Sequence, residues 1–278
     1  MEKLGQKVPY FFPVSLIKWR ECLFEDKLDN EKMFSSQETF VAVEKEQIIG
    51  FIQYGQPASA WDEKGSKYRN PQIGIIRHFY FDEGRFDAAA TLCAKSEDYM
   101  GQFPNQHAFY HSFGMSCNAH HGKLHQTLAH IDRFLCEHGY QIEHENLYYS
   151  LVLAGKESYP QNELRLVPKP KLKPDLQEYE ICLQENPMGM IQIQFLEDLT
   201  GGVTSDTVYL TWMAIHKALR RQGWGTKAMQ MLVTDLLNRG YQHLHLDTSS
   251  TNEVAQQFYN QYGFQNRGLT RCYLKATR

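Results

Sequence analysis

The fold of the C-terminal half follows from one stretch, Thr207-Val-Tyr-Leu-Thr-Trp-Met-Ala-Ile215, with its continuation His216-Lys-Ala-Leu and Arg220-Arg-Gln-Gly-Trp-Gly225. Its first part is rich in β-branched and aromatic residues and predicts a strand. Beyond the glycines, apolar residues recur at helical spacing from Thr226 to Arg239, and Gly240 suits the left-handed end of that helix. The predicted order is therefore strand, basic glycine turn, helix.

A turn of this kind can hold a phosphate. The N-terminus of a helix presents unpaired N–H groups and a partial positive charge, and Gly223 and Gly225 lack the β-carbons that would keep a ligand away. Arg220 and Arg221 add full positive charges at the same place. The glycine spacing alone is weak evidence, because a plain tight turn has the same pattern.

Gly223-Trp-Gly225-Thr-Lys-Ala228 also fits the dinucleotide-binding pattern, with Asp247 as a ribose ligand. We disfavour this interpretation, because seven residues separate the strand from the first glycine instead of almost none. Only 31 residues follow Asp247, which is too few to complete a doubly wound sheet.

A second helix is predicted after Asp247. Ser250-Thr-Asn-Glu253 has the form of a capping box and predicts the start of the helix. Val254, Phe258 and Tyr262 form the predicted core stripe. A neighbouring stripe consists of Asn252, Ala255 and Tyr259. A phenol, with its usual pKa near 10, is a suitable proton donor to a departing thiolate, although an isolated tyrosine is more often part of a core wall.

Taken together, the two motifs resemble the GNAT superfamily of N-acetyltransferases. The resemblance covers roughly 208–278 and implies an acyl-CoA cosubstrate, most simply acetyl-CoA, with direct transfer to an amine and no covalent enzyme intermediate. It implies that Tyr259 protonates the leaving thiolate. It implies cofactor contacts, by pantetheine or pyrophosphate, from the following residues: Met213, Ala214, Ile215, Arg220, Arg221, Gln222, Gly223, Trp224, Gly225, Thr226, Asn252 and Ala255.

Two features depart from the family pattern. Lys217 stands where a proline is frequent. The segment Pro168 to Gln177 is too short for the helical pair that usually separates the first two strands and shapes the acceptor pocket. We therefore expect the N-terminal half to supply that wall.

A weak internal repeat predicts a tandem protein. Phe258 to Phe264 and Phe134 to Tyr140 each end a helix at a glycine and lead through an aromatic residue into a strand. The expected fold class is α/β (α+β): two GNAT-like modules, each a mixed, mostly antiparallel central sheet flanked by helices. We place the boundary near residue 157, with a degenerate module at 1–157 and a cofactor-binding module at 158–278.

The N-terminal module is expected neither to bind coenzyme A nor to catalyse. Its predicted strand Ile73–Phe81 runs into Asp82-Glu-Gly-Arg-Phe-Asp87, where the acids would repel a pyrophosphate. Leu135 stands at the position that matches Tyr259.

The remaining predicted elements follow from periodicity and turn residues. They are a helix over Pro13–Leu28; strands over 39–43, 48–54 and 73–81; a helix over 86–100; strands over 164–167, 179–184, 190–195, 208–215 and 243–247; a helix over 251–261; and a last strand.

Composition narrows the class of protein. A formal net charge of -3 gives no basic field for nucleic acid or anionic membrane, and no apolar run is long enough to span a membrane. Six scattered cysteines without a C-x-x-C pair argue against disulfides and thiolate zinc, and predict free thiols in a cytoplasmic protein. Eight of the twelve histidines lie between His107 and His144, but their spacing matches no zinc pattern, so we expect no metal.

The predicted function is acyl-CoA-dependent N-acyl transfer to an amine on a small molecule or peptide. A non-catalytic acyl-CoA-binding or protein-interaction module remains the alternative, and an aminoacyl transferase would need a basic surface of tRNA size. The sequence leaves the general base open among four residues: His216, Asp247, Glu197 and Asp198. It also leaves the oligomeric state open, although a tandem pair can bury the surface that single modules use to dimerise.

Overall fold

The computed structural model describes residues 7–28, 31–61, 64, 66–119, 121–155, 164–171 and 173–276. Contacts divide the chain into two compact units, and neither unit is continuous in sequence. Unit 1 comprises Met1–Phe11, Trp19–Asn146 and Leu269–Arg278; unit 2 comprises Phe12–Lys18 and Leu147–Gly268. The boundary predicted near residue 157 falls at 156–163, outside the described residues.

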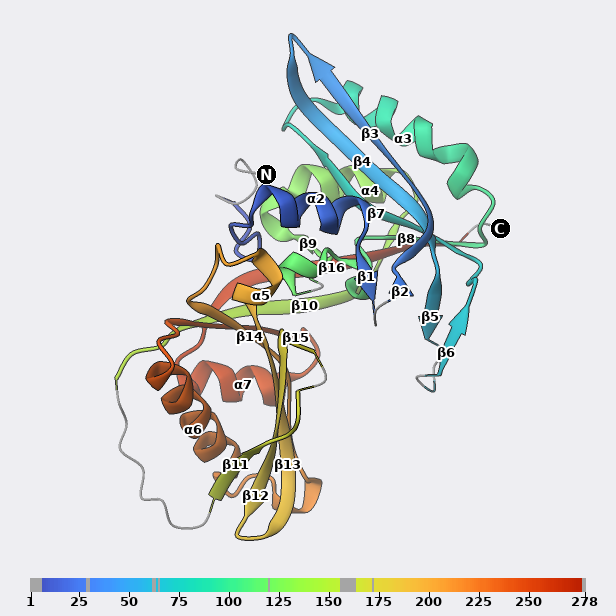
Figure 1. Ribbon diagram of the computed structural model, residues 1–278. Coiled ribbons are helices and arrows are strands. Elements are labelled where there is room, and N and C mark those ends of the chain that lie inside the picture. The colour runs from blue at the N-terminus through green and yellow to red at the C-terminus, as the bar shows by residue number, and fades with distance from the viewer. Residues whose placement is uncertain are drawn as a thin grey trace. The chain divides into compact units, whose positions relative to one another are not determined.

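Unit 2 is a mixed sheet with α6 (Trp224–Asn238) and α7 (Glu253–Tyr262) packed on one face (Figure 1). Its antiparallel strands are β11 (Leu164–Pro168), β12 (Leu176–Leu183), β13 (Asn186–Phe195) and β14 (Thr207–Ile215). β15 (His243–Ser249) then pairs in parallel with β14. A further helix is α5 (Leu196–Thr200), and the short turn η4 (Lys217–Leu219) precedes α6.

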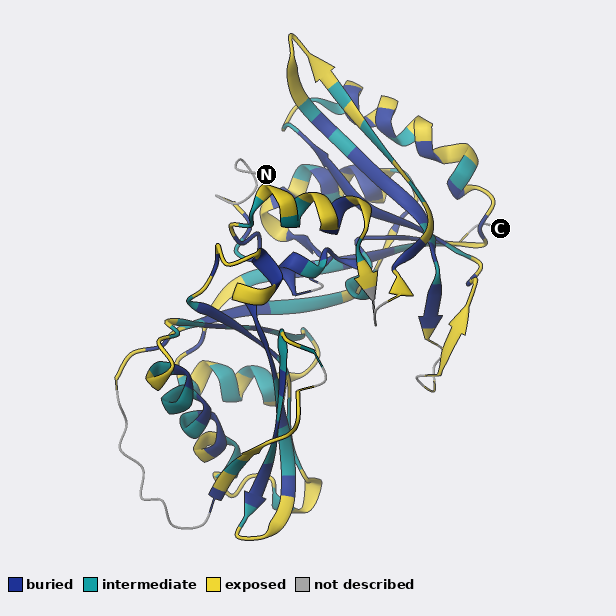
Figure 2. Cartoon of the chain, viewed as in Figure 1, coloured by how far each residue is buried: buried dark blue, intermediate teal, exposed yellow. Residues whose placement is uncertain are grey.

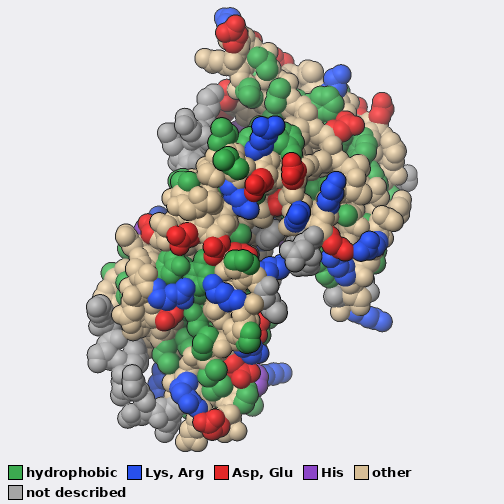
Figure 3. All heavy atoms as spheres, in the orientation of Figure 1, with side chains coloured by type: hydrophobic (Ala, Val, Ile, Leu, Met, Phe, Trp, Pro, Cys, Tyr) green, Lys and Arg blue, Asp and Glu red, His purple; other side chains and the backbone are tan. Residues whose placement is uncertain are grey.

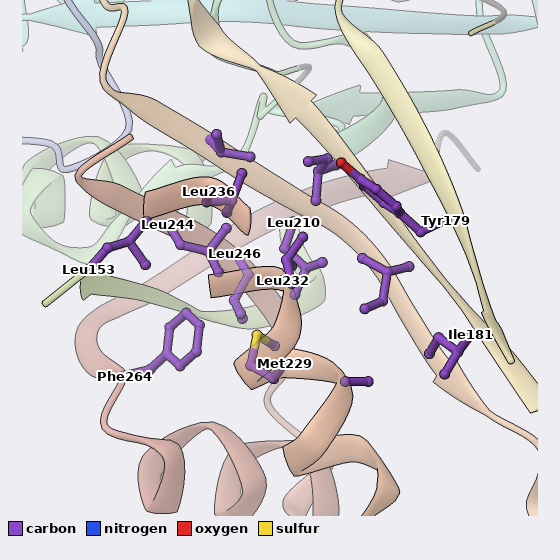
Figure 4. Close-up of a cluster of buried hydrophobic side chains, with 14 of the residues drawn as sticks. Leu153, Tyr179, Ile181, Leu210, Met229, Leu232, Leu236, Leu244, Leu246 and Phe264 are labelled. Carbon is purple, nitrogen blue, oxygen red and sulfur yellow. The ribbon is translucent and has the colours of Figure 1, made fainter. Parts of the chain in front are cut away.

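The core of unit 2 follows the alternation of its strands. Leu244 and Leu246 of β15 point to the same side as Leu210 of β14, where they meet Leu232 and Leu236 of α6 (Figure 4). The helical period of α6 supplies the matching stripe, and its carbonyls at Leu236 and Leu237 accept from the N–H groups of Tyr241 and Gly240. The glycine-ended helix predicted from sequence is therefore confirmed.

Unit 1 repeats this arrangement. Its main strands are β3 (Phe34–Glu44), β4 (Gln47–Pro57), β7 (Ile73–Phe81) and β8 (Asn105–Ala108), of which the first three are antiparallel and β8 is parallel to β7. The helices are α3 (Phe86–Met100), α4 (Ala129–Glu137) and α2 (Leu16–Phe24), of which α2 belongs to unit 1 only from Trp19. α3 packs on β4 and β7. Smaller elements are β1 (Lys27–Leu28), β2 (Glu31–Lys32), β5 (Ser59–Trp61), β6 (Lys67–Arg69), η1 (His111–Phe113), η2 (Ser116–Asn118), β9 (Leu124–His125) and η3 (Gln126–Leu128).

Two long strands change unit along their length. β10 (Gln141–Val152) enters unit 2 after Asn146, and β16 (Gln265–Ala276) enters unit 1 at Leu269, where it pairs with β8 and β9. In each unit the crossover helix of the parallel pair is 15 residues long, and a second helix then ends before a glycine with positive φ. The predicted fold class of two similar mixed modules is confirmed.

Two sequence predictions about the elements need correction. The helix expected over Pro13–Leu28 is only Leu16–Phe24. Its periodicity, through Leu16, Ile17, Cys22 and Leu23, also predicts one apolar face, but Leu16 and Ile17 are 77% and 76% exposed. A helix of nine residues makes little more than two turns, so its periodicity defines no reliable face. Only Cys22 and Leu23 are buried, and α2 is largely exposed in Figure 2.

Candidate functional site

The strands β14 and β15 separate at the place where the sequence predicts the cofactor. They pair only over Thr207–Tyr209 and His243–His245, although both strands continue. The register of β14 on β13 shifts at Gln192, and Thr211 Oγ1 donates to the Gln192 carbonyl over 3.0 Å. A bulge of this kind bends its strand, which accounts for the separation.

Met213, Ala214 and Ile215 therefore lie beyond the part of β14 that pairs with β15. They still pair with β13. A β-carbon added to Gly189 would lie 2.2 Å from the Ala214 carbonyl oxygen, so only glycine permits this close approach.

The basic glycine turn forms the N-terminus of α6. Gly223 is the N-cap with φ +82°, and Arg221 is also left-handed with φ +62°. The first turn of α6 contains no acidic residue, and its N-cap makes no side-chain hydrogen bond. Arg220 Nε instead donates to the Ile215 carbonyl over 2.9 Å and ties the turn to β14, while Trp224 Nε1 donates to Gln222 Oε1 over 3.3 Å. The helix thus begins with uncapped N–H groups beside the Arg221 cation.

The start of α6, the end of β14 and the middle of α7 converge. A β-carbon placed on Gly225 would lie 3.6 Å from Phe258 and 4.0 Å from the Met213 methyl carbon. The residues predicted for the pyrophosphate loop, 220–226, and those predicted for the pantetheine arm therefore belong to one region of unit 2.

The start of α7 differs from the prediction. The helix begins at Glu253 with Asn252 as N-cap, and Asn252 Oδ1 accepts from the Ala255 N–H over 3.2 Å. The capping box expected from Ser250 is wrong, because a closer amide performs that role. Val254, predicted for the core stripe, is 63% exposed, since it lies in the first turn, before the helix reaches the sheet.

Tyr259 is held between aromatic side chains. Its ring centroid lies 5.4 Å from Phe264, 5.3 Å from Phe258 and 6.0 Å from Tyr149 of β10. Burial and then the Asp247 carboxylate raise the pKa of Tyr259 to about 12. The phenol therefore stays protonated at neutral pH, as a proton donor must.

A polar cluster that the sequence did not reveal surrounds Asp247. Tyr209 OH donates to Asp247 Oδ1 over 2.8 Å, and the Tyr148 hydroxyl is hydrogen-bonded to His245 Nδ1 over 2.9 Å. Burial lowers the pKa of His245 to about 4, and burial and then Asp247 raise the pKa of Tyr209 well above its usual value. The β14–β15 register, which pairs Tyr209 with His245, could have suggested the contact only after the strands were aligned.

The other residues named as candidate bases are all exposed. His216 is exposed in the turn after β14. Glu197 and Asp198 are exposed in the first turn of α5. The pKa of Tyr241 is raised mainly by burial and further by these two carboxylates. Tyr241 precedes β15, so this is the opposite end of the sheet from the separation of β14 and β15.

A cavity of about 470 Å³ lies between α6, α7 and the end of β10. It shares Thr226 with the predicted cofactor residues. Its other lining residues are Leu151, Val152, Leu153, Ala154, Gly155, Gln230, Val233, Thr234, Phe258, Gln261 and Tyr262.

Residues 142–264 match the acetyltransferase (GNAT) family. The chain therefore carries a GNAT domain. The match begins within β10, ahead of residue 157, and so includes Tyr148 and Tyr149. This GNAT domain contains every residue that the sequence predicted for the cofactor and for proton donation.

One curated relative is N-alpha-acetyltransferase 30 of Schizosaccharomyces pombe, which is 40% identical over 70 residues. That alignment covers 25% of this chain and 47% of the relative, so the chain spans about half the length of the curated relative it matches.

Solved structures extend the similarity of fold to most of the chain. A tandem GNAT protein from the clavulanic acid biosynthesis pathway aligns with a TM-score of 0.56 at 10% identity, over 87% of this chain and 83% of that one. A glucosamine N-acetyltransferase region of a fungal multi-domain β-N-acetylglucosaminidase aligns with a TM-score of 0.60 at 12% identity, over 95% of this chain and 35% of that one. At these identities the comparison shows the fold alone.

Outside the GNAT domain, several histidines have structural partners. His130 Nε2 is hydrogen-bonded to the Phe81 carbonyl over 2.9 Å, His138 Nδ1 to the Phe134 carbonyl over 2.8 Å, and His107 Nδ1 to Glu143 over 3.1 Å. Among the described residues, no group of three or more His, Cys, Asp or Glu side chains could hold a metal ion.

No helix in the part of the chain that the structure describes is long and apolar enough to cross a membrane. Lys, Arg, Asp and Glu side chains are interspersed over the face drawn in Figure 3.

Proposed function

We propose that the chain is an acyl-CoA-dependent N-acyltransferase whose catalytic site lies in unit 2, with acetyl-CoA as the donor. The observation that carries this proposal is the convergence of three features. These are the separation of β14 from β15, the uncapped N-terminus of α6, and a phenol, Tyr259, that remains protonated.

The cofactor would be held by this chain's own backbone. The N–H groups at the start of α6 and the Arg221 guanidinium would bind the diphosphate, because charge and geometry there favour an anion. The end of β14 at Met213–Ile215 would face the pantetheine arm, and Asn252 and Ala255 would line its other side. When bound, acetyl-CoA supplies the acyl group as a thioester. Tyr259 then donates a proton to the leaving sulfur.

The proposed acceptor is a primary amine on a small molecule or a peptide. The curated relative's name denotes transfer to α-amino groups, which favours peptide N-termini as the first acceptors to test. The free, mostly buried cysteines support a reducing compartment, and we propose the cytoplasm.

The first test is release of free thiol from acetyl-CoA with a panel of amines: a peptide with a free N-terminus, glucosamine and a polyamine. We expect turnover with at least one of them, and coenzyme A binding in calorimetry. Binding without thiol release for any amine would favour a non-catalytic acyl-CoA-binding module instead.

Tyr259→Phe tests the proton donor. We expect kcat to fall about 100-fold, with an unchanged dissociation constant for coenzyme A, because the ring packing survives and only the proton is lost. Tyr241→Phe, the same change at the opposite end of the sheet, is the control and should not alter turnover. Full activity of Tyr259→Phe across the pH range would remove the phenol from the mechanism.

A further inference from the structure

The side chain of Asp247 lies on the sheet face opposite the helices. Leu244 and Leu246 of β15 enter the core beneath α6, so strand alternation directs Asp247 to the other face. Tyr209 of β14 lies on that same face, since its neighbours Val208 and Leu210 are in the core. The 2.8 Å hydrogen bond between Tyr209 and Asp247 agrees with this geometry.

Asp247 also lies at the point where the strands part. His245 is the last residue of β15 that pairs with β14, and Asp247 follows two residues later. Tyr259 approaches the same point from α7, on the helix side of the sheet. A thioester at the opening between the strands would have a phenol toward one face and a carboxylate toward the other.

Three phenols from three elements surround this carboxylate. Tyr148 of β10, Tyr209 of β14 and Tyr259 of α7 each have a pKa that burial raises first and the Asp247 charge raises further. His245, on the same strand, has its pKa lowered by burial. These three phenols and the His245 imidazole are thus neutral near pH 7.

We propose that Asp247 is the general base that accepts the proton lost by the attacking amine, and that Tyr209 is a positioning residue that orients its carboxylate. This inference rests on the proposed function. The amine nitrogen forms a bond to the acyl carbon and the carbon–sulfur bond breaks. The N–H proton passes to Asp247 and the sulfur takes the proton of Tyr259. Solvent then removes the first proton and restores the second, so the net products are an amide and a thiol.

A carboxylate is adequate for this step. A peptide α-amine has a pKa near 8, so a useful fraction is already neutral close to pH 7. The N–H becomes acidic only as the bond to carbon forms, and a carboxylate positioned there can then accept it. The pair Glu197 and Asp198 lies at the other end of the sheet.

The test compares Asp247→Asn with Asp198→Asn, a matched change at the other end of the sheet. With acetyl-CoA and a peptide bearing a free N-terminus, we expect Asp247→Asn to lower kcat/KM about 100-fold near neutral pH. The affinity for coenzyme A should change less than about twofold, and Asp198→Asn should match the wild type. The difference in kcat/KM between Asp247→Asn and the wild type should become smaller as the pH rises, because hydroxide then removes the proton instead.

Tyr209→Phe supplies a second readout that keeps the ring in place. It should lower kcat by about tenfold with little change in KM, and its deficit should also narrow at high pH. If Asp247→Asn does not fold, Tyr209→Phe alone tests the inference. A loss of kcat in Tyr209→Phe that stays the same at every pH then overturns it. A loss equal in both Asp→Asn variants, or activity of Asp247→Asn within about threefold of wild type at every pH, also overturns it.

The same experiment separates this inference from the proposed function. A wild-type protein that binds coenzyme A but acetylates no amine in the panel removes both. A wild-type protein that turns over while Asp247→Asn keeps its activity removes only the base.

Discussion

Each unit contains a parallel pair of strands, β14 with β15 in unit 2 and β7 with β8 in unit 1, and the two pairs differ in how they end. In unit 2 the last pair is Tyr209 with His245, and three residues separate the end of β15 from α7. In unit 1 the last pair is Ile76 with Ala108, and 20 residues, 109–128, intervene before α4. The last residue pair of the parallel strands is therefore polar and titratable in unit 2 and apolar in unit 1.

The intervening segment of unit 1 folds back against β7. Arg77, only 2% exposed, donates from Nε to the Phe113 carbonyl over 2.9 Å and from Nη2 to the Gly114 carbonyl over 3.1 Å. Phe109 is fully buried, and its ring lies 5.6 Å from Tyr80, which in turn lies 5.8 Å from Phe11. Side chains of unit 1 itself therefore pack where its parallel strands end.

The crossover helices differ in the same sense. At the start of α3, Arg85 pairs with Glu44 over 2.8 Å and with Asp87 over 3.1 Å, and Asp87 lies in the first turn. At the start of α6 the first turn has no acid, and Arg221 stands beside the N-cap. The first turn of α3 thus carries an acid paired within unit 1, whereas the start of α6 offers a cation and no acid. This contrast supports the prediction that only unit 2 binds the cofactor.

The largest expected effect comes from Arg77→Met. The Arg77 and Asp26 side chains are 1% and 5% exposed, and removal of the cation leaves a buried carboxylate without its partner. We expect unit 1 to lose about 4 kcal/mol of unfolding free energy, measured by urea denaturation. Coenzyme A affinity of the folded protein should be unchanged.

Arg85→Met is the control for Arg77→Met, since its ion pairs are solvent-exposed and contribute little. Equal stability of the two variants would show that the network around Arg77 does not hold unit 1 together. Loss of coenzyme A binding in folded Arg77→Met would mean that unit 1, and not unit 2 alone, contributes to the cofactor site.

The next effect depends on pH. Burial lowers the pKa of His245 to about 4, below its usual value near 6.5. Between these values the unfolded chain binds a proton that the folded chain does not, so stability falls as the pH falls from about 6.5 to about 4. The full loss is about 3 kcal/mol.

His245→Gln should remove this part of the slope of unfolding free energy against pH. In unit 1, burial and then Arg77 likewise lower the pKa of His78, so His78→Gln is the matched variant for that unit. A slope that His245→Gln leaves unaltered would mean that the imidazole is not held neutral beside Tyr148.

Local patterns predicted the C-terminal half well. The strand at 208–215, the glycine turn and the helix that ends before Gly240 all depend on residues close in sequence, and the structure contains each of them. The repeat that aligns Gly139 with Gly263 predicted two similar units, and both glycines have positive φ after a helix.

Contacts between distant segments escaped prediction. Nothing in the alternation of β10 indicates that its second half, with Tyr148 and Tyr149, belongs to unit 2. Arg77 stands in an apolar strand, and its partners are carbonyls at Cys22, Phe113 and Gly114 that no local pattern identifies. The predicted start of α7 was also wrong. Asn252 and Ser250 are both good N-cap residues, and which of them caps the helix depends on the backbone conformation.

A third prediction sharpens the contrast between the two helix N-termini. Arg221→Glu places a like charge beside the proposed diphosphate, and we expect the dissociation constant for coenzyme A to rise at least tenfold in calorimetry. The equivalent change in unit 1, Arg85→Glu, should leave that affinity unchanged. If Arg85→Glu weakens binding as much as Arg221→Glu does, unit 1 holds a second cofactor site.

The smallest effects come from the two glycines of the turn, and they should differ in sign. Gly223 has φ +82° with nothing within 4 Å of an added β-carbon, so Gly223→Ala costs only backbone strain, about 1 kcal/mol of unfolding free energy. Gly225 lies inside the first turn of α6, where a β-carbon would make only ordinary contact with Phe258. Gly225→Ala should therefore raise stability by about 0.5 kcal/mol, because alanine loses less entropy in a helix. If backbone amides of this turn hold a diphosphate, both variants weaken coenzyme A binding, although one protein is less stable and the other more so. Affinity that simply follows stability would mean that the turn supports the fold and does not touch the cofactor.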